Sequence, residues 1–240
     1  MFVNGERKSG RVVLYDDGGT IRLESNGQNT SNKVELSFIV DATGSMGDEL
    51  EFLKDDLRSV IEDVQSQNNS LDISTSAVFY RDEGDEYVTR DSDFTNDLSR
   101  TIDFINNQSA GGGGDYPEAV HSGMTKAINN FDWSEDAITK IAFLILDAPP
   151  HHKPQVINDI KVSIREAAEK GIKIIPITAS GIQKDTELLM RYLSIATNST
   201  YVFITNDSGI GNDHITATVG DYEVEFLNDL MVRLITKYSE

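Results

Sequence analysis

The sequence predicts an α/β fold in which helices cover both faces of a doubly wound, mostly parallel central sheet with one antiparallel edge strand. Two short runs of apolar and β-branched residues, at 34–40 and 141–146, are typical of strands buried on both faces. Longer segments with apolar residues at helical spacing alternate with such strands along the chain. This alternation, without an internal repeat, is typical of a Rossmann-like sheet.

The beginning of the chain differs from the rest. Short β patterns at 11–15 and 20–24 flank a cluster of turn-forming residues, so we expect a small β-hairpin there. A hairpin on its own is only marginally stable. We therefore expect residues 1–33 to be an extension that packs on the main domain, or the remnant of an upstream β domain. The main domain would occupy residues 34–240.

The strand at 34–40 is followed by a predicted helix that ends near Asn68. Strands are then expected at 73–80 and 86–90, joined by the polar turn 82–85. A connection this short makes the two strands antiparallel, because a parallel pair requires a crossover. The strand at 86–90 is therefore the predicted antiparallel edge strand.

Helices and strands alternate through the remainder of the chain. Leu98, Ile102 and Ile105 mark a helix with Thr95 as its expected N-cap. Pro117 fits the first turn of the next helix. The remaining expected elements are a strand at 141–146, a helix at 157–168 closed by Gly171, a strand at 174–178, a helix at 188–196, a strand at 201–204 and a helix at 224–235.

The composition excludes several classes of function. Apolar residues make up 38% of the 240 residues and charged residues 25%, which is ordinary for a globular chain. The net charge of −19 argues against nucleic acid or an anionic membrane surface as a partner, because phosphate-rich surfaces would repel the chain. The absence of cysteine excludes disulfides, thiolate catalysis and thiolate zinc sites.

The sequence leaves the cellular location open. No stretch is long and apolar enough to span a bilayer, so we expect no direct membrane insertion. The first ten residues lack the apolar core of a secretory signal. We therefore expect either a cytoplasmic protein or a domain cut from a longer extracellular or cell-surface precursor.

Oxygen-bearing side chains follow the ends of two predicted central strands. Asp41 ends the first strand and is followed by Thr43 and Ser45, Asp147 ends the strand at 141–146, and Asp115 follows a run of glycines. Because the carboxyl ends of parallel strands meet at one edge of a sheet, these side chains can converge. Carboxylate and hydroxyl oxygens suit a hard divalent cation such as Mg²⁺. The alternative is that the two strand-end aspartates only cap the helices that follow.

The pattern Asp41-x-Thr43-x-Ser45 resembles the metal-ion-dependent adhesion site of von Willebrand factor type A (vWA) domains. The resemblance is nearest to vWA domains of bacterial proteins and of an alpha-kinase branch. Four segments carry it in order, namely DATGSMGDE at 41–49, VFYRDEGDEYVTR at 78–90, GGGGDYPEAV at 111–120 and LDAPPHH at 146–152. It extends from about residue 34 to the C-terminus and leaves the first 33 residues unexplained.

The resemblance implies a role for each residue of the predicted site. Asp41 would reach the metal directly or through water, Thr43 and Ser45 would ligate through their hydroxyls, and Asp147 would act through water. The family usually supplies a threonine from the middle loop, where this chain has Asp115. A third carboxylate should tighten cation binding and make the ion less attractive to an incoming acid. The implied cofactor is Mg²⁺, with Mn²⁺ or Ca²⁺ as alternatives.

The function implied by the resemblance is a non-enzymatic binding module for adhesion or for the assembly of a protein complex. Its partner would be a protein that presents an Asp or Glu carboxylate to the cation. One rival is a Mg²⁺-dependent hydrolase or phosphotransferase that uses the same acids. Such an enzyme should also supply a cation for the transition state, and Lys153 is the one lysine in the candidate loops. A second rival is a scaffold in which the metal only stabilises the fold.

Four further residues carry weaker predictions. Asp48 and Glu49 follow the predicted ligands at the spacing where some integrin chains hold a second metal ion. Two acids in the first turn of a helix are also favoured by the helix dipole alone. Tyr116 and His151 are candidate ligand contacts at the rim, although packing explains the tyrosine equally well and the histidine fits an ordinary loop position.

Overall fold

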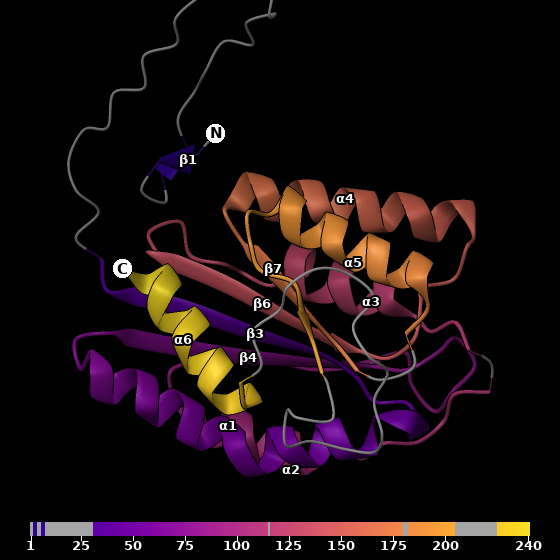
Figure 1. Cartoon of the computed structure of the whole chain (residues 1–240), viewed down its shortest axis with the longest axis horizontal. Helices are drawn as coiled ribbons and strands as arrows, with labels where there is room; N and C mark the ends of the chain where they lie inside the picture. Colours follow the sequence, from indigo (N-terminus) through magenta and orange to yellow (C-terminus); the bar gives the residue numbers. More distant parts are fainter. Residues whose placement is uncertain (1, 4–5, 8–30, 115, 180–181, 205–224) are drawn as a thin grey trace, which may run out of the picture.

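The computed structural model describes residues 2–3, 6–7, 31–114, 116–179, 182–204 and 225–240. A six-stranded sheet with the order β5-β4-β3-β6-β7-β8 forms its centre (Figure 1). The strands are β3 Lys33–Asp41, β4 Asp72–Tyr80, β5 Thr89–Thr95, β6 Thr139–Leu146, β7 Lys173–Thr178 and β8 Val202–Phe203. Strand β5 is antiparallel to β4, and every other neighbouring pair in this sheet is parallel. The predicted fold class is confirmed.

Helices cover both faces of the sheet. They are the 3-10 helix η2 Gly44–Met46, α1 Gly47–Gln67, α2 Leu98–Asn106, α3 Val120–Met124, the π-helix η3 Thr125–Asn130, α4 Pro154–Lys170, α5 Lys184–Ala196 and α6 Leu227–Ser239. Figure 1 shows α1, α2 and α6 on one face and α3, α4 and α5 on the other. Two buried apolar clusters correspond to these two layers.

Strand β3 is the centre of the sheet and fixes the level at which the neighbouring strands end. Its side chains are buried along almost its whole length, as the doubly buried pattern predicted. Phe38 stacks on Phe143 of β6 with ring centroids 5.6 Å apart, and burying one such side chain contributes about 1.5–3 kcal/mol. In the register of the sheet Asp41 lies opposite Tyr80 of β4, while Val40 lies opposite Ile145 of β6. The ends of three strands are therefore held side by side.

The predicted edge strand begins three residues too early. Strand β5 starts at Thr89 instead of residue 86, because residues 81–88 form an ordered loop that Arg81 closes by donating its backbone N–H to the carbonyl of Val88 (3.0 Å). The polar turn is therefore one part of a longer connection. The antiparallel pairing with β4 is as predicted.

The predicted N-cap of the next helix is also wrong. Thr95 is the last residue of β5, and its hydroxyl accepts a hydrogen bond from the backbone N–H of Asp97 (3.1 Å). The residue that caps α2 is Asp97, whose carboxylate accepts from the backbone N–H of Ser99 (3.1 Å). Aspartate and threonine are both good caps, so spacing alone did not separate them.

The helix expected at Pro117 begins three residues later, at Val120. The delay arises because Glu118 pairs with the loop after β6: its backbone N–H donates to the carbonyl of Pro149 (2.9 Å). Smaller differences concern the later elements. Helix α5 starts at residue 184 instead of 188, β8 covers only 202–203, and α6 starts at 227 instead of 224.

At the N-terminus the structure describes two strands of two residues each. Strand β1, Phe2–Val3, pairs antiparallel with β2, Glu6–Arg7. The hairpin strands predicted at 11–15 and 20–24 lie outside the described residues. The division of the chain at residue 34 stays a prediction.

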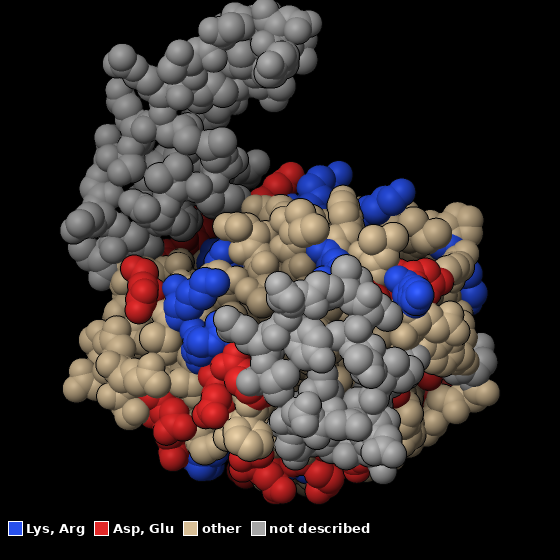
Figure 2. Space-filling view, in the orientation of Figure 1, with Lys and Arg blue, Asp and Glu red and all other residues tan. Residues whose placement is uncertain are grey.

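The negative charge of the chain is visible on the helices that cover one face of the sheet. Figure 2 shows acidic side chains along the lower face, over α1 and α2. Exposed acids of α1 include Glu51, Asp55, Glu62 and Asp63.

None of the helices among the described residues combines the length and apolarity needed to cross a bilayer.

Candidate metal centre

Three loops are tied together at the carboxyl edge of the central strands. After β3, Ala42 donates its backbone N–H to the carbonyl of Tyr80 at the end of β4 (2.8 Å). Its own carbonyl accepts from the N–H of Gly111 (3.0 Å), and Gly44 donates to the carbonyl of Gly112 (3.4 Å). These bonds hold the glycine-rich loop against the turn between β3 and α1.

Asp41 is fully buried at the centre of this edge. Its Oδ1 accepts hydrogen bonds from the backbone N–H (2.9 Å) and the hydroxyl (2.7 Å) of Thr43. Its Oδ2 accepts no hydrogen bond of good geometry within the described residues, and the buried side chain of Tyr80 lies close enough to lower the pKa of the carboxyl group. Burial raises the pKa of Asp41 to about 7, against the opposing effect of the Thr43 bonds and with a further contribution from the charge of Asp147.

Asp147 and Ser45 form a second pair beside the first. Asp147 follows β6 and is half-buried, and its Oδ1 also lacks a partner within the described part of the chain. Burial raises the pKa of Asp147, while a hydrogen bond from the Ser45 side chain lowers it. Each of the two predicted hydroxyl residues therefore pairs with one predicted carboxylate: Thr43 with Asp41, and Ser45 with Asp147.

A carboxylate that the sequence analysis missed lies in the same place. Glu118 is buried, and its Oε2 has no hydrogen-bond partner among the described residues. Burial raises the pKa of Glu118 to about 8, and the nearby charges of Asp41, Asp82, Asp85 and Asp147 contribute in the same direction. The acid predicted from the segment after the glycine run was Asp115, which lies outside the described residues, and Glu118 follows it three residues later.

The glycine-rich loop fits closely around an aspartate of the β4–β5 loop. The Oδ2 of Asp85 accepts from the backbone N–H of Gly113 (3.0 Å) and of Asp82 (3.2 Å). Gly112 has a φ of +79°, and a Cβ on it would lie 2.5 Å from Asp85 Oδ2. Both the conformation and the space at this position therefore require glycine.

Arg81 braces the same loops from behind. Its side chain is buried, and its Nε donates to the carbonyl of Ala42 (3.1 Å) while a terminal guanidinium nitrogen donates to the carbonyl of Ser109 (2.7 Å). The guanidinium also lies 4.5 Å from the ring centroid of Tyr87. The positive charge of Arg81 is thus used to fix backbone positions of two site loops.

A model of the von Willebrand factor A domain matches residues 35–215 of this chain, well over half of its length. The chain belongs to the von Willebrand factor A domain family. The match confirms the resemblance seen in the four sequence segments.

Two curated proteins are similar to about half of this chain. An ariadne-like RING finger protein of Acanthamoeba polyphaga mimivirus is 38% identical over 120 residues, which is 50% of this chain and 11% of that protein. The alpha-protein kinase vwkA of Dictyostelium discoideum is 35% identical over 133 residues, which is 55% of this chain and 21% of the kinase. The chain therefore matches only a small part of either relative.

Solved structures share the architecture. BatB from Bacteroides thetaiotaomicron superposes with a TM-score of 0.57 at 13% identity, covering 86% of this chain and 98% of that one. The pilus adhesin SpaC from Lactobacillus rhamnosus GG gives a TM-score of 0.54 at 12% identity, covering 88% of this chain and 30% of the adhesin. At these identities the similarity shows the fold alone.

The structure brings four of the five predicted vWA ligands together. Asp41, Thr43, Ser45 and Asp147 meet at one point of the sheet edge, as described above. Asp115 lies outside the described residues.

The predicted second site and rim contacts have different surroundings. Asp48 is exposed and Glu49 is buried in the first turn of α1, so the two acids face different environments. The Nε2 of His151 lies 2.6 Å from Asp82 Oδ1 and joins the loops after β6 and β4. Tyr116 is 41% exposed. Partial burial raises the pKa of its hydroxyl group, and a hydrogen bond with the backbone of Gln183 acts in the opposite direction.

The donors gathered here fit a hard divalent cation. Asp41 and Asp147 each leave one buried oxygen without a partner, and Thr43 and Ser45 add hydroxyl oxygens beside them. An all-oxygen set of this kind suits Mg²⁺. Within the described ranges, no three His, Asp or Glu side chains are arranged to hold a metal ion by themselves.

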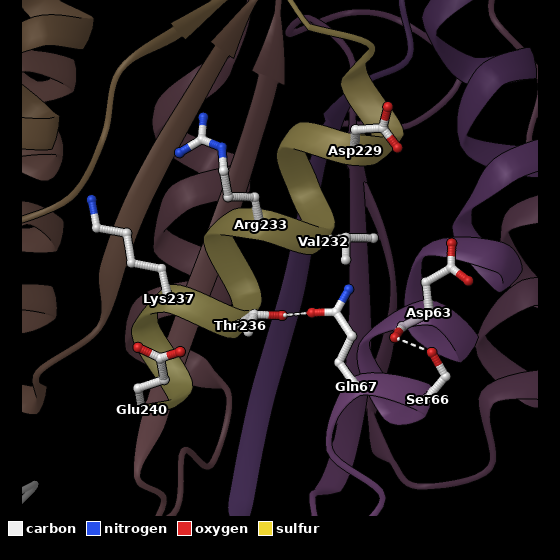
Figure 3. A pocket seen from close by; sticks show the side chains of 9 residues that line it. All are labelled: Asp63, Ser66, Gln67, Asp229, Val232, Arg233, Thr236, Lys237 and Glu240. Atoms are coloured by element: carbon white, nitrogen blue, oxygen red, sulfur yellow. Dashed lines mark hydrogen bonds between the residues drawn. The ribbon is translucent and has the colours of Figure 1, made fainter.

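The structure also contains a hollow that is separate from this centre. About 510 Å³ in volume, it lies between the end of α1 and α6, where Figure 3 shows Gln67 hydrogen-bonded to Thr236. Because α1 begins beside the candidate centre and rises about 1.5 Å per residue, this hollow is roughly 30 Å away. It does not contribute to the candidate metal centre.

Proposed function

We propose that this vWA domain is a divalent-cation-dependent protein-binding module that takes up a carboxylate of its partner, for adhesion or for the assembly of a complex. Domains of this family generally mediate protein–protein interactions. The observation that supports the proposal for this chain is the pair of buried, unpartnered oxygens, Asp41 Oδ2 and Asp147 Oδ1, at one edge of the sheet. Buried polar groups normally find hydrogen-bond partners, so two unpartnered carboxylate oxygens in one place call for a ligand.

Asp41, Thr43, Ser45 and Asp147 would hold the cation. A bound Mg²⁺ supplies a positive centre at which an outside carboxylate oxygen can replace a water molecule. The chain prepares its own groups for this role. The Thr43 hydroxyl donates its hydrogen to Asp41, which leaves the lone pairs of the hydroxyl oxygen available to a cation. A hydrogen bond from the Ser45 side chain likewise lowers the pKa of Asp147.

The surroundings of the centre suggest what else the partner carries. The chain has a net charge of −19, and Asp82, Asp85 and Glu118 lie near the proposed ligands. A lone acidic side chain approaching this edge would be repelled at long range. We therefore expect the partner to present its Asp or Glu among basic residues, which would steer association and make it sensitive to salt.

We propose a binding function in preference to hydrolysis because the nearby cationic side chains already have partners. The ammonium of Lys153 lies 2.9 Å from Glu83 Oε2, and Arg81 is bound to backbone carbonyls. A phosphoryl-transfer enzyme needs a positive group directed at the transition state. The contacts of Lys153 and Arg81 use their charges elsewhere, so neither is directed at a reacting phosphoryl group.

Calorimetry with Mg²⁺, Mn²⁺ and Ca²⁺ on the wild type and on Asp41→Ala tests the first part of the proposal. We expect the wild type to bind a cation and the variant to lose that binding. The Mn²⁺-loaded protein should then take up glutarate, detected as a change in the Mn²⁺ electron paramagnetic resonance spectrum, and should not take up the uncharged analogue glutaramide. Cation binding without glutarate binding would support the scaffold instead. Cation-dependent hydrolysis of p-nitrophenyl phosphate that Asp41→Ala abolishes would support the enzyme.

A further inference from the structure

Glu118 is the buried acid of this edge that neither the motif nor the family resemblance assigns. Its side chain is only 3% exposed, and its Oε2 has no hydrogen-bond partner in the described part of the chain. No Lys, Arg or His among the described residues forms an ion pair with it. Buried carboxylates are normally paired or bound to a metal, so this one lacks the usual compensation.

The side chain of Glu118 is directed at the proposed ligands. A Cβ built on Gly113 would lie 3.0 Å from Glu118 Oε1 and 3.2 Å from the Cβ of Thr43. The carboxylate and the threonine therefore approach the same glycine closely. Because Gly113 has no side chain, the glutamate reaches the space beside Thr43.

The backbone of Glu118 is fixed to the loop that carries Asp147. Its N–H donates to the carbonyl of Pro149 (2.9 Å), and the residue forms a parallel bridge with Pro150. Its carbonyl accepts from the N–H of Val120 at the start of α3 (2.9 Å). These contacts place Glu118 between the two loops that supply the other acids.

We propose that Glu118 is a third acidic group of the metal centre, which acts on the cation by its charge and through a bridging water. This inference rests on the proposed function, because it assumes that a cation binds among Asp41, Thr43, Ser45 and Asp147. Replacing a residue in the outer coordination shell of a metal commonly weakens metal binding by roughly 10–100-fold.

The proposal has two consequences of opposite sign, and Glu118→Gln tests both. Removing the charge should weaken Mg²⁺ and Mn²⁺ binding by roughly 10–100-fold, measured by calorimetry. It should also raise the midpoint of thermal unfolding of the metal-free protein by about 2–4 °C, because an uncharged amide replaces an acid that is unfavourable to bury beside other acids. A purely structural role would lower both quantities or leave the cation affinity unchanged.

Two further variants complete the experiment. Glu118→Asp keeps the charge but withdraws the carboxylate by one methylene, and should weaken cation binding without stabilising the metal-free protein. Glu83→Gln removes an exposed charge of the neighbouring loop that pairs with Lys153, and should change cation affinity less than about twofold.

The outcomes separate this inference from the proposed function. Wild-type cation binding that Glu118→Gln leaves unchanged would overturn the role of Glu118 and leave the proposed function standing. A wild type that binds no divalent cation would overturn both. Weaker cation binding by Glu118→Gln together with a lower unfolding midpoint would point to damaged folding and would also reject the proposal.

Discussion

Strand β3 carries a buried acid near each end, and the two carboxylates differ in the hydrogen-bond and ion-pair partners that surround them. Glu35, near the start, is 1% exposed, and Asp41, at the end, is fully buried. Glu35 accepts hydrogen bonds from the backbone N–H (2.9 Å) and the hydroxyl of Ser134 and lies 3.2 Å from the ammonium of Lys33. One oxygen of Asp41 accepts no hydrogen bond of good geometry from the described residues. The same strand therefore satisfies one buried carboxylate completely and the other only in part.

The difference extends to the two edges of the sheet. At the amino edge Lys140 is buried and donates to the carbonyl of Lys170 (3.2 Å), so positive charge accompanies Glu35. At the carboxyl edge Asp147 and Glu118 each add a further unpartnered oxygen. Leaving a buried charged group unpaired destabilises a fold by several kcal/mol. The proposed cation would offset this effect at the carboxyl edge, and the predictions below test the contrast between the two edges.

The largest effect is expected from Asp41→Asn. The variant keeps the shape of the side chain and an oxygen that can accept from Thr43, but it removes the charge that would face the proposed cation. We expect affinity for Mg²⁺ and Mn²⁺ to fall by roughly 100-fold or more, measured by calorimetry. The metal-free protein should be as stable as the wild type or more so. A large loss of stability in the metal-free state would mean that this acid is structural, like Glu35.

The opposite result is expected from Glu35→Gln. Its charged hydrogen bonds and its ion pair with Lys33 are lost, so the free energy of unfolding in urea should fall by about 1–3 kcal/mol. Cation affinity should stay within about twofold of the wild type. Equal effects of this variant and of Asp41→Asn on cation affinity would remove the distinction between the edges.

The stability of the metal-free protein should depend on pH through the carboxyl edge. The folded-state pKa is raised to about 7 for Asp41 and about 8 for Glu118, so the folded chain holds protons that the unfolded chain releases near pH 4. Their stabilising effect is complete below the unfolded pKa values and is lost as the pH rises through the folded ones. Thermal unfolding should therefore occur at a lower temperature at about pH 8 than at about pH 5.5.

Cations should reverse this trend, because they bind the deprotonated carboxylates. Apparent Mg²⁺ affinity should rise with pH between about 6 and 8, by up to about tenfold per pH unit for each proton displaced. Asp41→Asn should flatten the pH dependence of the metal-free protein. A wild type whose metal-free stability is constant over this range would contradict the account of the buried acids.

The smallest effect is expected from His151→Ala, which removes the contact with Asp82 between the loops after β6 and β4. The free energy of unfolding should fall by about 0.5–1.5 kcal/mol. Cation affinity should fall about two- to threefold because Asp147 is held less firmly. His152→Ala, at the exposed neighbouring position, is the matched control and should change neither quantity measurably. Equal effects of the two substitutions would show that the contact does not support the site.

Much of this architecture could be predicted from the sequence, because hydrophobic periodicity reports directly on burial. The run at 34–40 became the central strand, and Asp41 and Asp147 lie at the strand ends where the pattern placed them. Thr43 and Ser45 follow Asp41 at fixed spacing in one short turn, so their position beside the strand ends could also be predicted.

The remaining features depend on contacts between distant segments. Glu118 looked like a residue in the first turn of a helix, and only its pairing with Pro149 and Pro150 in the fold turns it toward the other acids. The edge strand was placed early because the closure of the loop by Arg81 and Val88 leaves no periodic pattern. The change to a π-helix at Thr125–Asn130 likewise has no local signal in the sequence.

Anomalous diffraction from crystals of the wild-type protein soaked in Mn²⁺ tests the central claim most directly. The account predicts one manganese ion at the carboxyl edge of β3, at about 2.1 Å from the hydroxyl oxygens of Thr43 and Ser45. Asp41 and Asp147 should face it, and at least one coordination position should hold water or a small carboxylate from the solution. No manganese at this edge, or an ion enclosed entirely by protein oxygens, would contradict the account.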